Sequence, residues 1–352
     1  MRDIRAQAFS FSYLYQVKFQ YSSGMKVLFI GGTGFISTSV SRMAVERGIE
    51  LYLLNRGQRA SEIPGCIQLT GDIHNQESLR GALKDLKFDA VVDWIAFTPE
   101  DVMRDLAVFR GRTKQFVFIS SASAYQKPPA NYIITESTPL ENPYWDYSRN
   151  KIASEELLMK TYREEDFPVT IVHPSFTYNT YLPVAIGGFG CYTLADRMKK
   201  GLPIIVHGDG SSLWVNTHAE DFAVGLLGLL GNEKTIGEAF HITSDEVLSW
   251  NQIYQTIADA LQVAPNIIHI PSDFIVKVEP QYEGPLFGDK TWSVAFDNSK
   301  IKAFVPEFRT TILFQEGMRR AVEWFDAGQK RQRIDVQVNR EMDRIIQAYA
   351  GK

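Results

Sequence analysis

Residues 26–37 read KVLFIGGTGFIS, and this stretch decides the fold. The apolar run 26–30 predicts a buried strand, the glycines predict a tight turn, and the residues from Ser37 onward predict a helix. Gly31 permits the turn, and Gly34 lets the backbone approach a pyrophosphate whose charge the amides at the helix N-terminus would meet. Ser37 replaces the third glycine of the usual pattern and is small enough to fit between helix and strand. The stretch predicts a dinucleotide-binding βαβ unit, the alternative being a glycine turn kept for packing.

The same alternation of apolar runs and amphipathic segments continues along the first half of the chain. Further strands are predicted at 50–54, 66–70, 89–96, 115–120 and 169–173, with helices between them that include 76–86 and 146–162. Strands that alternate with helices indicate a parallel sheet covered on both faces. The expected fold class is therefore α/β, a doubly wound Rossmann sheet with a smaller C-terminal substrate-binding subdomain.

The expected domain boundaries follow from where this regularity stops. After Pro174 the pattern is richer in Gly and Pro, with helices expected at 219–230 and 249–261. Residues 1–24 alternate aromatic and polar side chains, which we interpret as an extension without fixed structure, or else as an edge strand or oligomer contact. The expected parts are an extension at 1–24, a dinucleotide-binding domain at 25–178 with returning segments near 213–245, a mainly substrate-binding part at 179–330, and a C-terminal helix at 331–352.

The composition argues against several classes of protein. The 352 residues carry a formal net charge of −4 with both signs interspersed, so nothing in the charge indicates a nucleic-acid partner. Two cysteines, Cys66 and Cys191, cannot form a disulfide framework, and a reducing cytoplasm is the default location. No stretch is long and apolar enough to span a bilayer, so no membrane partner is expected. His207 and His218 lack the spacing of metal ligands, and no metal is expected.

The turns after the second and third predicted strands bear on the choice of cofactor. Asn55-Arg56-Gly57 stands where an acidic residue commonly binds the adenosine ribose of NAD. Asn55 removes the repulsion toward a 2′-phosphate and Arg56 would pair with it, so NADP is preferred over NAD. The alternative is that Arg56 is a solvated turn residue. Asp72-Ile73 is placed either to meet the adenine edge or, through Asp72, to cap the next helix.

Tyr147 and Lys151 are expected near the start of the helix at 146–162. Their i,i+4 spacing puts both side chains on one helix face. A lysine beside a phenol favours the phenolate, which would lower the pKa of Tyr147 as a general acid/base requires. Ser121 lies at the C-terminal end of the fifth strand, where such sheets bind ligands, and would stabilise charge on a reacting oxygen. The alternative is a serine-rich loop beside a surface Tyr/Lys pair.

Three motifs, GGTGFIS at 31–37, SSASAY at 120–125 and YSRNK at 147–151, together resemble the extended short-chain dehydrogenase/reductase superfamily, often labelled NAD-dependent epimerase/dehydratase. The resemblance covers Met25 to about residue 330. Within the superfamily the chain is most similar to an unassigned bacterial branch that resembles the chloroplast stem-loop-binding proteins. The resemblance implies that Tyr147 is the acid/base, that Lys151 binds the nicotinamide ribose and that Ser121 holds the substrate oxygen. It also makes a homodimer an expected assembly.

The resemblance further implies that Ile95-Ala96-Phe97 lines the cofactor and that Pro174-Ser175 lies against the nicotinamide. Ser123, Tyr125 and Trp214 are weaker candidates for contact with a small-molecule substrate. The full set of expected cofactor residues is Gly31, Thr33, Gly34, Phe35, Ile36, Asn55, Arg56, Asp72, Ile73, Ile95, Ala96, Phe97, Ser120, Tyr147, Lys151, Pro174 and Ser175.

Two departures from the family pattern bear on the substrate. Nucleotide-sugar members usually hold the substrate diphosphate with two arginines, and Trp214 and Leu286 stand in those places. Either another cation serves or the substrate is not a nucleotide sugar, and Trp214 either stacks on a ring of the substrate or belongs to the core. Ala122 and Ser123 stand where a dehydratase needs an added acid/base pair, which leaves an epimerase or a reductase.

Two kinds of function remain. One is an oxidoreductase or epimerase that moves a hydride at a hydroxyl- or carbonyl-bearing carbon of a sugar or sugar derivative. NADP would favour a reductase, because an epimerase returns its own hydride and gains nothing from the NADPH pool. The alternative is a non-catalytic nucleotide- or RNA-binding protein of the same fold, as some relatives bind RNA. The acidic pI and the lack of a basic stripe count against that alternative.

Overall fold

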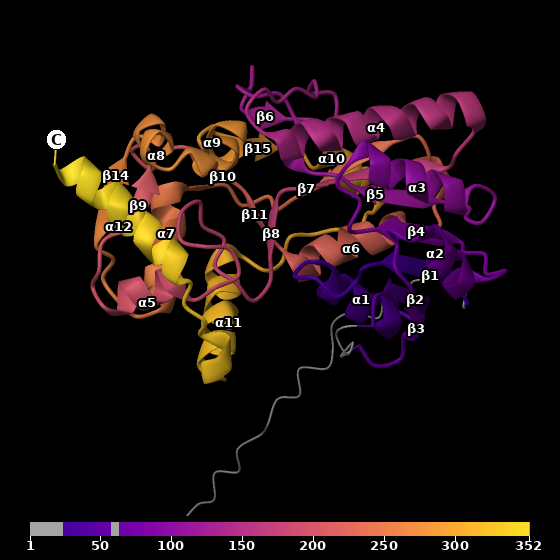
Figure 1. Cartoon of the computed structure of the whole chain (residues 1–352), viewed down its shortest axis with the longest axis horizontal. Helices are drawn as coiled ribbons and strands as arrows, with labels where there is room; N and C mark the ends of the chain where they lie inside the picture. Colours follow the sequence, from indigo (N-terminus) through magenta and orange to yellow (C-terminus); the bar gives the residue numbers. More distant parts are fainter. Residues whose placement is uncertain (1–23, 58–62, 352) are drawn as a thin grey trace, which may run out of the picture.

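The computed structural model describes residues 24–57 and 63–351, and its centre is a seven-stranded parallel sheet (Figure 1). The strand order is β12-β7-β5-β4-β1-β2-β3, so the order reverses between β1 and β4. In such sheets ligands bind outside the carboxyl ends of the strands at this reversal. The predicted Rossmann class is confirmed. The strands are β1 (Lys26–Ile30), β2 (Glu50–Asn55), β3 (Ile67–Thr70), β4 (Ala90–Asp93), β5 (Phe116–Ile119), β7 (Val169–Pro174) and β12 (Ala239–Ile242).

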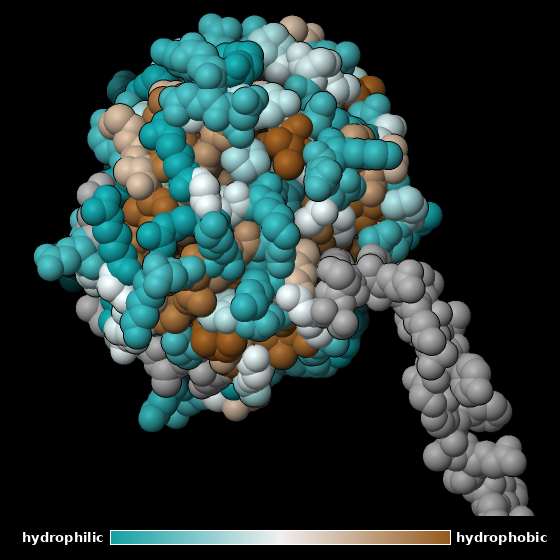
Figure 2. Space-filling view, turned by 90° about the vertical axis from the view of Figure 1, so that its right-hand side faces the viewer, coloured by the Kyte–Doolittle hydropathy of each residue, from teal (hydrophilic) through white to brown (hydrophobic). Residues whose placement is uncertain are grey.

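Both faces of the sheet are apolar, which is why helices cover both. In β1, Val27 and Phe29 pack into one apolar core while Leu28 and Ile30 pack into another on the opposite face. Seen from the right-hand side of Figure 1, hydrophilic side chains predominate at the surface, with apolar ones in scattered patches (Figure 2). The first face is covered by α1 (Ser37–Glu46), α6 (Ala219–Leu229) and α10 (Ser299–Phe304), and the second by α2 (Gln76–Leu83), α3 (Pro99–Phe109) and α4 (Asp146–Glu165).

Two features of the sheet differ from the sequence prediction. The fourth strand ends at Asp93, because Asp93 Oδ1 accepts hydrogen bonds from the amides of Ile95 (2.6 Å) and Ala96 (2.9 Å) and turns the chain. A seventh strand, β12, pairs with β7. It was not among the predicted strands, although it lies within the returning segments expected near 213–245. A long segment of chain separates the two strands, so local patterns do not show that they pair. Almost all of the extension predicted at 1–24 lies outside the described residues.

The smaller part of the molecule, on the left of Figure 1, has an apolar core of its own that includes Trp250, Tyr254 and Phe314. Four short strand pairs belong to it or join it to the sheet: β6 (Ile133–Ile134) with β15 (Ala295–Phe296), β8 (Phe176–Tyr178) with β11 (Asn216–His218), β9 (Ile204–His207) with β14 (Ile267–Ile270), and β10 (Leu213–Trp214) with β13 (Leu248–Ser249). Its helices are α5 (Thr193–Lys199), α7 (Trp250–Ala260), α8 (Ser272–Val278), α9 (Glu283–Pro285), α11 (Phe314–Asp326) and α12 (Val336–Ala350).

Among the helices of residues 24–57 and 63–351, none combines the length and the apolar character that a bilayer span requires. The longest, α4, has 20 residues but is strongly polar on the side away from the sheet.

Candidate active site

Two cavities open beyond the carboxyl ends of the sheet strands and adjoin one another. The strand-end cavity, about 830 Å³ in volume, is lined by the loops that follow β1, β2, β3, β4 and β5. The aromatic cavity, about 570 Å³, is lined by the loop after β5, by the start of α4 and by the smaller part of the molecule. Tyr147, Pro174 and Phe189 line both cavities. A group bound in one cavity therefore meets a group bound in the other beside Tyr147.

The glycine turn at one end of the strand-end cavity has no room for side chains. Gly31 has φ +95°, and a Cβ on it would lie 3.2 Å from Ile95 Cγ2. Gly32 has φ +91°, and a Cβ on it would lie 2.7 Å from Leu53 Cδ2. L-residues rarely adopt such angles. Ser37 is buried at the start of α1 in the place of the usual third glycine. This bare turn beside a helix N-terminus fits the pyrophosphate of a dinucleotide.

The turns after β2 and β3 are held by short polar side chains. Asn55 Oδ1 accepts a hydrogen bond from the amide two residues on, at 2.9 Å, and Arg56 is exposed and lines the cavity. Asp72 Oδ1 likewise accepts from the amide two residues on, at 3.0 Å. Asn75, not Asp72, caps α2. The alternative in which Asp72 caps that helix is therefore wrong, and Asp72 lines the cavity instead.

The strand-end cavity gathers nearly all of the expected cofactor residues. Ala96 and Ser175 are the exceptions: the Ala96 carbonyl accepts a hydrogen bond from Lys151, and Ser175 lines the aromatic cavity. Phe189 also lines this cavity, although the sequence analysis did not predict it. It comes from a loop distant in the sequence, and no motif marks it. The expected residues that line it are Gly31, Thr33, Gly34, Phe35, Ile36, Asn55, Arg56, Asp72, Ile73, Ile95, Phe97, Ser120, Tyr147, Lys151 and Pro174.

Ser121, Tyr147 and Lys151 converge where the cavities meet. Because α4 begins at Asp146, Tyr147 and Lys151 lie one turn apart on its first two turns. The Lys151 ammonium donates to the carbonyl oxygens of Ala96 and Ile119, each at 2.7 Å, and lies 5.9 Å from the centroid of the Tyr147 ring. An ammonium has three N–H donors, so one remains for a group in the strand-end cavity that Lys151 lines.

Burial shifts the pKa values of Tyr147 and Lys151. It raises the pKa of Tyr147 above its ordinary value, and a hydrogen bond with the Ser121 side chain opposes this only in part. Burial also lowers the pKa of Lys151 to about 8, although nearby carboxylates, Asp93 foremost, act in the other direction. The predicted lowering of the Tyr147 pKa by Lys151 is not found in this structure: burial raises this pKa, and Lys151, whose ammonium is bonded to two carbonyls, is not among the groups that act on it. At neutral pH Tyr147 is a proton donor.

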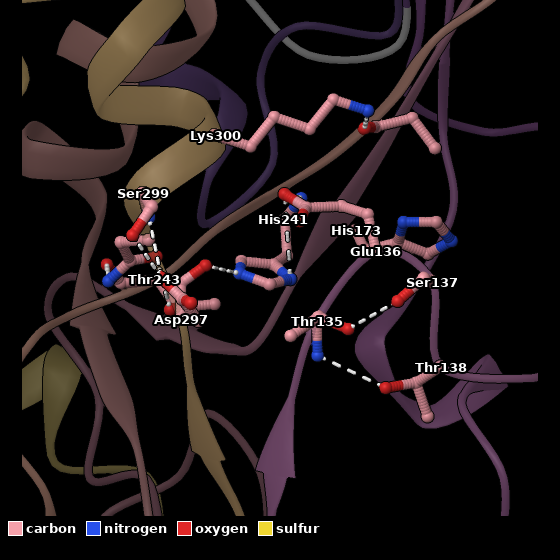
Figure 3. Close-up of polar contacts among 12 residues, drawn as sticks. Thr135, Glu136, Ser137, Thr138, His173, His241, Thr243, Asp297, Ser299 and Lys300 are labelled. Atoms are coloured by element: carbon pink, nitrogen blue, oxygen red, sulfur yellow. Dashed lines mark hydrogen bonds and ion pairs between the residues drawn. The ribbon is translucent and has the colours of Figure 1, made fainter.

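A buried polar cluster lies behind the trio and includes Glu155, His173, Tyr125 and His241. Glu155, one turn beyond Lys151 on α4, accepts from His173 Nε2 at 2.9 Å. The Tyr125 hydroxyl lies 3.4 Å from Nδ1 of both histidines. Figure 3 shows the His241 ring directed at the backbone carbonyl of Asp297, 2.7 Å away, and burial lowers the pKa of His241 to about 4. Tyr125, expected as a weak substrate candidate, is 1% exposed and lines neither cavity.

The aromatic cavity holds the two other weak substrate candidates and two cations that the sequence did not reveal. Ser123 and Trp214 line it. Trp214 is also stacked on Trp250 with ring centroids 5.4 Å apart, so this side chain belongs to both the wall and the core. Lys127 and Lys290 line the same cavity. They come from segments far apart in the chain, and no local motif marks either of them.

Two known proteins are similar to the chain over most of its length. It is 26% identical over 306 residues to the chloroplast stem-loop binding protein of 41 kDa b of Arabidopsis thaliana, covering 82% of this chain and 76% of that protein. It is 23% identical over 290 residues to the 2′-dehydrokanamycin reductase of Streptomyces kanamyceticus, covering 81% and 80%.

Solved structures show the same fold. The UDP-glucose 4-epimerase of Thermus thermophilus, in a complex with NAD, superposes with a TM-score of 0.69 at 20% identity, covering 86% of this chain and 100% of that one. The family model described as the NAD dependent epimerase/dehydratase family matches residues 27–243. With this match over more than half of its length, the chain belongs to the NAD-dependent epimerase/dehydratase family.

Proposed function

We propose that this protein is an NADP-dependent reductase that converts a carbonyl of a small sugar-like substrate into a hydroxyl. The observation that carries the proposal is the position of Tyr147, a neutral phenol that lines the aromatic cavity together with Ser121 and the strand-end cavity together with Lys151. A carbonyl reduction needs a proton donor at this place, whereas the opposite reaction needs a base. The 23% identity to a 2′-dehydrokanamycin reductase is in keeping with this direction.

The strand-end cavity would hold NADP. The bare glycine turn and the N-terminus of α1 would receive the pyrophosphate, Arg56 would pair with the 2′-phosphate, and the free N–H of Lys151 would bind the nicotinamide ribose. When bound, the nicotinamide supplies the hydride that the reduction requires.

The residues at the junction would then handle the proton. Tyr147 donates its phenolic proton to the carbonyl oxygen as negative charge develops there, and Ser121 donates a hydrogen bond to the same oxygen. The Lys151 ammonium keeps positive charge close to the resulting phenolate. The substrate itself would occupy the aromatic cavity, between the loop after β5 and the part at 179–330.

The nucleotide carried by the purified full-length chain tests this proposal. We expect NADP or NADPH to bind, to exchange with free nucleotide, and to be bound more tightly than NAD. A tightly held, non-exchanging NAD would point to an epimerase and contradict the reductase. If the chain binds RNA more weakly as salt is added and takes up no nicotinamide nucleotide, the protein is a non-catalytic binding protein and not an enzyme.

A further inference from the structure

Two lysines with almost fully buried side chains face the aromatic cavity. Lys127 is 3% exposed and Lys290 is 8% exposed, and both line the cavity that also contains Ser121 and Tyr147. A buried ammonium is strongly destabilising unless its charge and its N–H donors are compensated. The partners of the two lysines therefore indicate which kind of ligand the cavity binds.

Lys290 is compensated within the protein. Its ammonium lies 3.1 Å from Asp289 Oδ2 and 4.9 Å and 5.7 Å from the ring centroids of Phe176 and Trp145. An ion pair and two aromatic faces stabilise one cation well. Its backbone is fixed as well, because its carbonyl accepts a hydrogen bond from Trp250 Nε1 at 3.0 Å.

Lys127 is not compensated in this way. Within residues 24–57 and 63–351, its ammonium makes one hydrogen bond, to the backbone carbonyl of Tyr125 at 3.2 Å. An ammonium has three donors, so two are left over in a cavity that Lys127 lines. Burial lowers the pKa of Lys127, and the one charge that acts against this is Asp289, which is already paired with Lys290.

Four charged side chains line the aromatic cavity, and they balance in number: Lys127 and Lys290 against Asp289 and Glu341. They do not balance in place, because Asp289 is paired with Lys290. Glu341 accepts from the Tyr282 hydroxyl at 3.0 Å and is not among the groups that act on Lys127. One oxyanion placed against Lys127 would pair with this ammonium and use its two spare donors.

We propose that Lys127 binds a single oxyanion of the substrate, a carboxylate or a phosphate monoester, at a position in the aromatic cavity other than that of the reacting carbonyl. This inference rests on the proposed function, since it places the reacting carbon at Tyr147 and the charged group elsewhere in the same cavity. A nucleoside diphosphate fits less well, because Trp214 and Leu286 stand where arginines would clamp it and Lys290 already has its own partner. The substrate class is therefore an acidic sugar or a sugar phosphate without a nucleotide.

Calorimetric titration of the NADP-saturated full chain tests the subsite with three matched probes: D-glucuronate, D-glucose 6-phosphate and neutral D-glucose. At least one charged probe is expected to bind about tenfold or more tightly than glucose, as a charge-assisted hydrogen bond implies, and the tighter of the two distinguishes a carboxylate from a phosphate. In Lys127→Met this preference is expected to disappear. Lys160→Met, which removes the same charge from an exposed position on α4, should keep it.

Three results would overturn the subsite: glucose binding as tightly as both anions, no binding of any probe, or an anion preference that survives in Lys127→Met. Lys127→Gln repeats the test with a polar side chain, and unchanged NADP affinity in both variants shows that they are folded. Repeating the titration without nucleotide separates this inference from the proposed function. If the proposed reductase function is wrong, NADP binding or turnover will be absent. The preference for anions can still be measured in that case, so the two proposals are tested separately.

Discussion

The strand-end cavity and the aromatic cavity share Tyr147, yet they are assembled differently. The strand-end cavity is lined by short runs that each follow a sheet strand, such as 30–37, 54–56 and 71–74. The aromatic cavity combines the loop after β5 with side chains from positions as far apart as Trp214 and Glu341. The first is thus a property of one sheet edge, and the second depends on how the two parts of the molecule pack together.

The two cavities also differ in where their charges lie. Arg56 in the strand-end cavity is exposed, so its charge is solvated and acts only on a group brought close to it. Lys127 in the aromatic cavity is buried and lacks full compensation. This contrast indicates that recognition of a cofactor common to a family can depend on backbone shape, whereas recognition of an individual substrate depends on a few desolvated side chains.

The strongest loss of activity is expected from a change at Tyr147, which lines both cavities. Tyr147→Phe removes the proton donor while leaving the shape of each cavity nearly unchanged, so turnover should fall by about 10²- to 10⁴-fold. NADP affinity should stay the same, as measured by fluorescence titration. Tyr144→Phe is the matched control, since Tyr144 is a neighbouring tyrosine that lines neither cavity. If Tyr147→Phe retains its turnover, Tyr147 is not the proton donor, and the proposed reaction at the junction of the two cavities is wrong.

A smaller effect is expected on the strand-end side alone. Arg56→Ala should weaken NADP binding by about tenfold, the value of one solvated charge-assisted hydrogen bond, and leave NAD binding unaltered. The aromatic cavity should keep its affinity for small anions. Arg42→Ala removes an exposed arginine on α1 outside both cavities and serves as the control. Equal losses for NADP and NAD would show that Arg56 does not meet a 2′-phosphate.

The weakest of these effects is expected to be the change of nucleotide affinity with pH. Burial lowers the pKa of Lys151 to about 8, so its ammonium is present below that pH and is lost as the pH rises through it. Nucleotide affinity should therefore fall by a few-fold between pH 7 and pH 9.5, while Tyr147, whose pKa is raised, stays protonated. Nucleotide titrations across this range measure the fall.

The lowered pKa of Lys151 has the opposite consequence for the free energy of unfolding. Between the lowered pKa of Lys151 in the folded chain and its ordinary value in the unfolded chain, the unfolded state binds more protons. The contribution of Lys151 to the free energy of unfolding therefore rises with pH in the window where nucleotide affinity falls. Denaturant titrations of the wild type and of Lys151→Met at pH 7 and pH 9.5 separate the two trends. A nucleotide affinity that is flat to pH 9.5 would contradict a functional role of this ammonium.

The sequence predicted six of the seven sheet strands within a few residues because each is a run of apolar side chains bounded by turn residues. It predicted many residues of the strand-end cavity because in a parallel sheet every strand ends at the same edge, and the family resemblance added others. It did not predict the pKa of Tyr147, because the i,i+4 spacing reports which charges are near but not how far the phenol is removed from water. Tyr125 was misplaced because its motif does not reveal the two histidines that surround its hydroxyl.

The sequence by itself determined the βαβ order, the glycine turn and the helical pairing of Tyr147 with Lys151, because these depend on neighbours within a few residues. Only the tertiary structure decided that β12 completes the sheet, that Glu155 meets His173, and that Lys127 and Lys290 enter one cavity. These contacts join segments separated by long stretches of chain. They are set by packing and by the compensation of buried charge, and neither leaves a periodic pattern in the sequence.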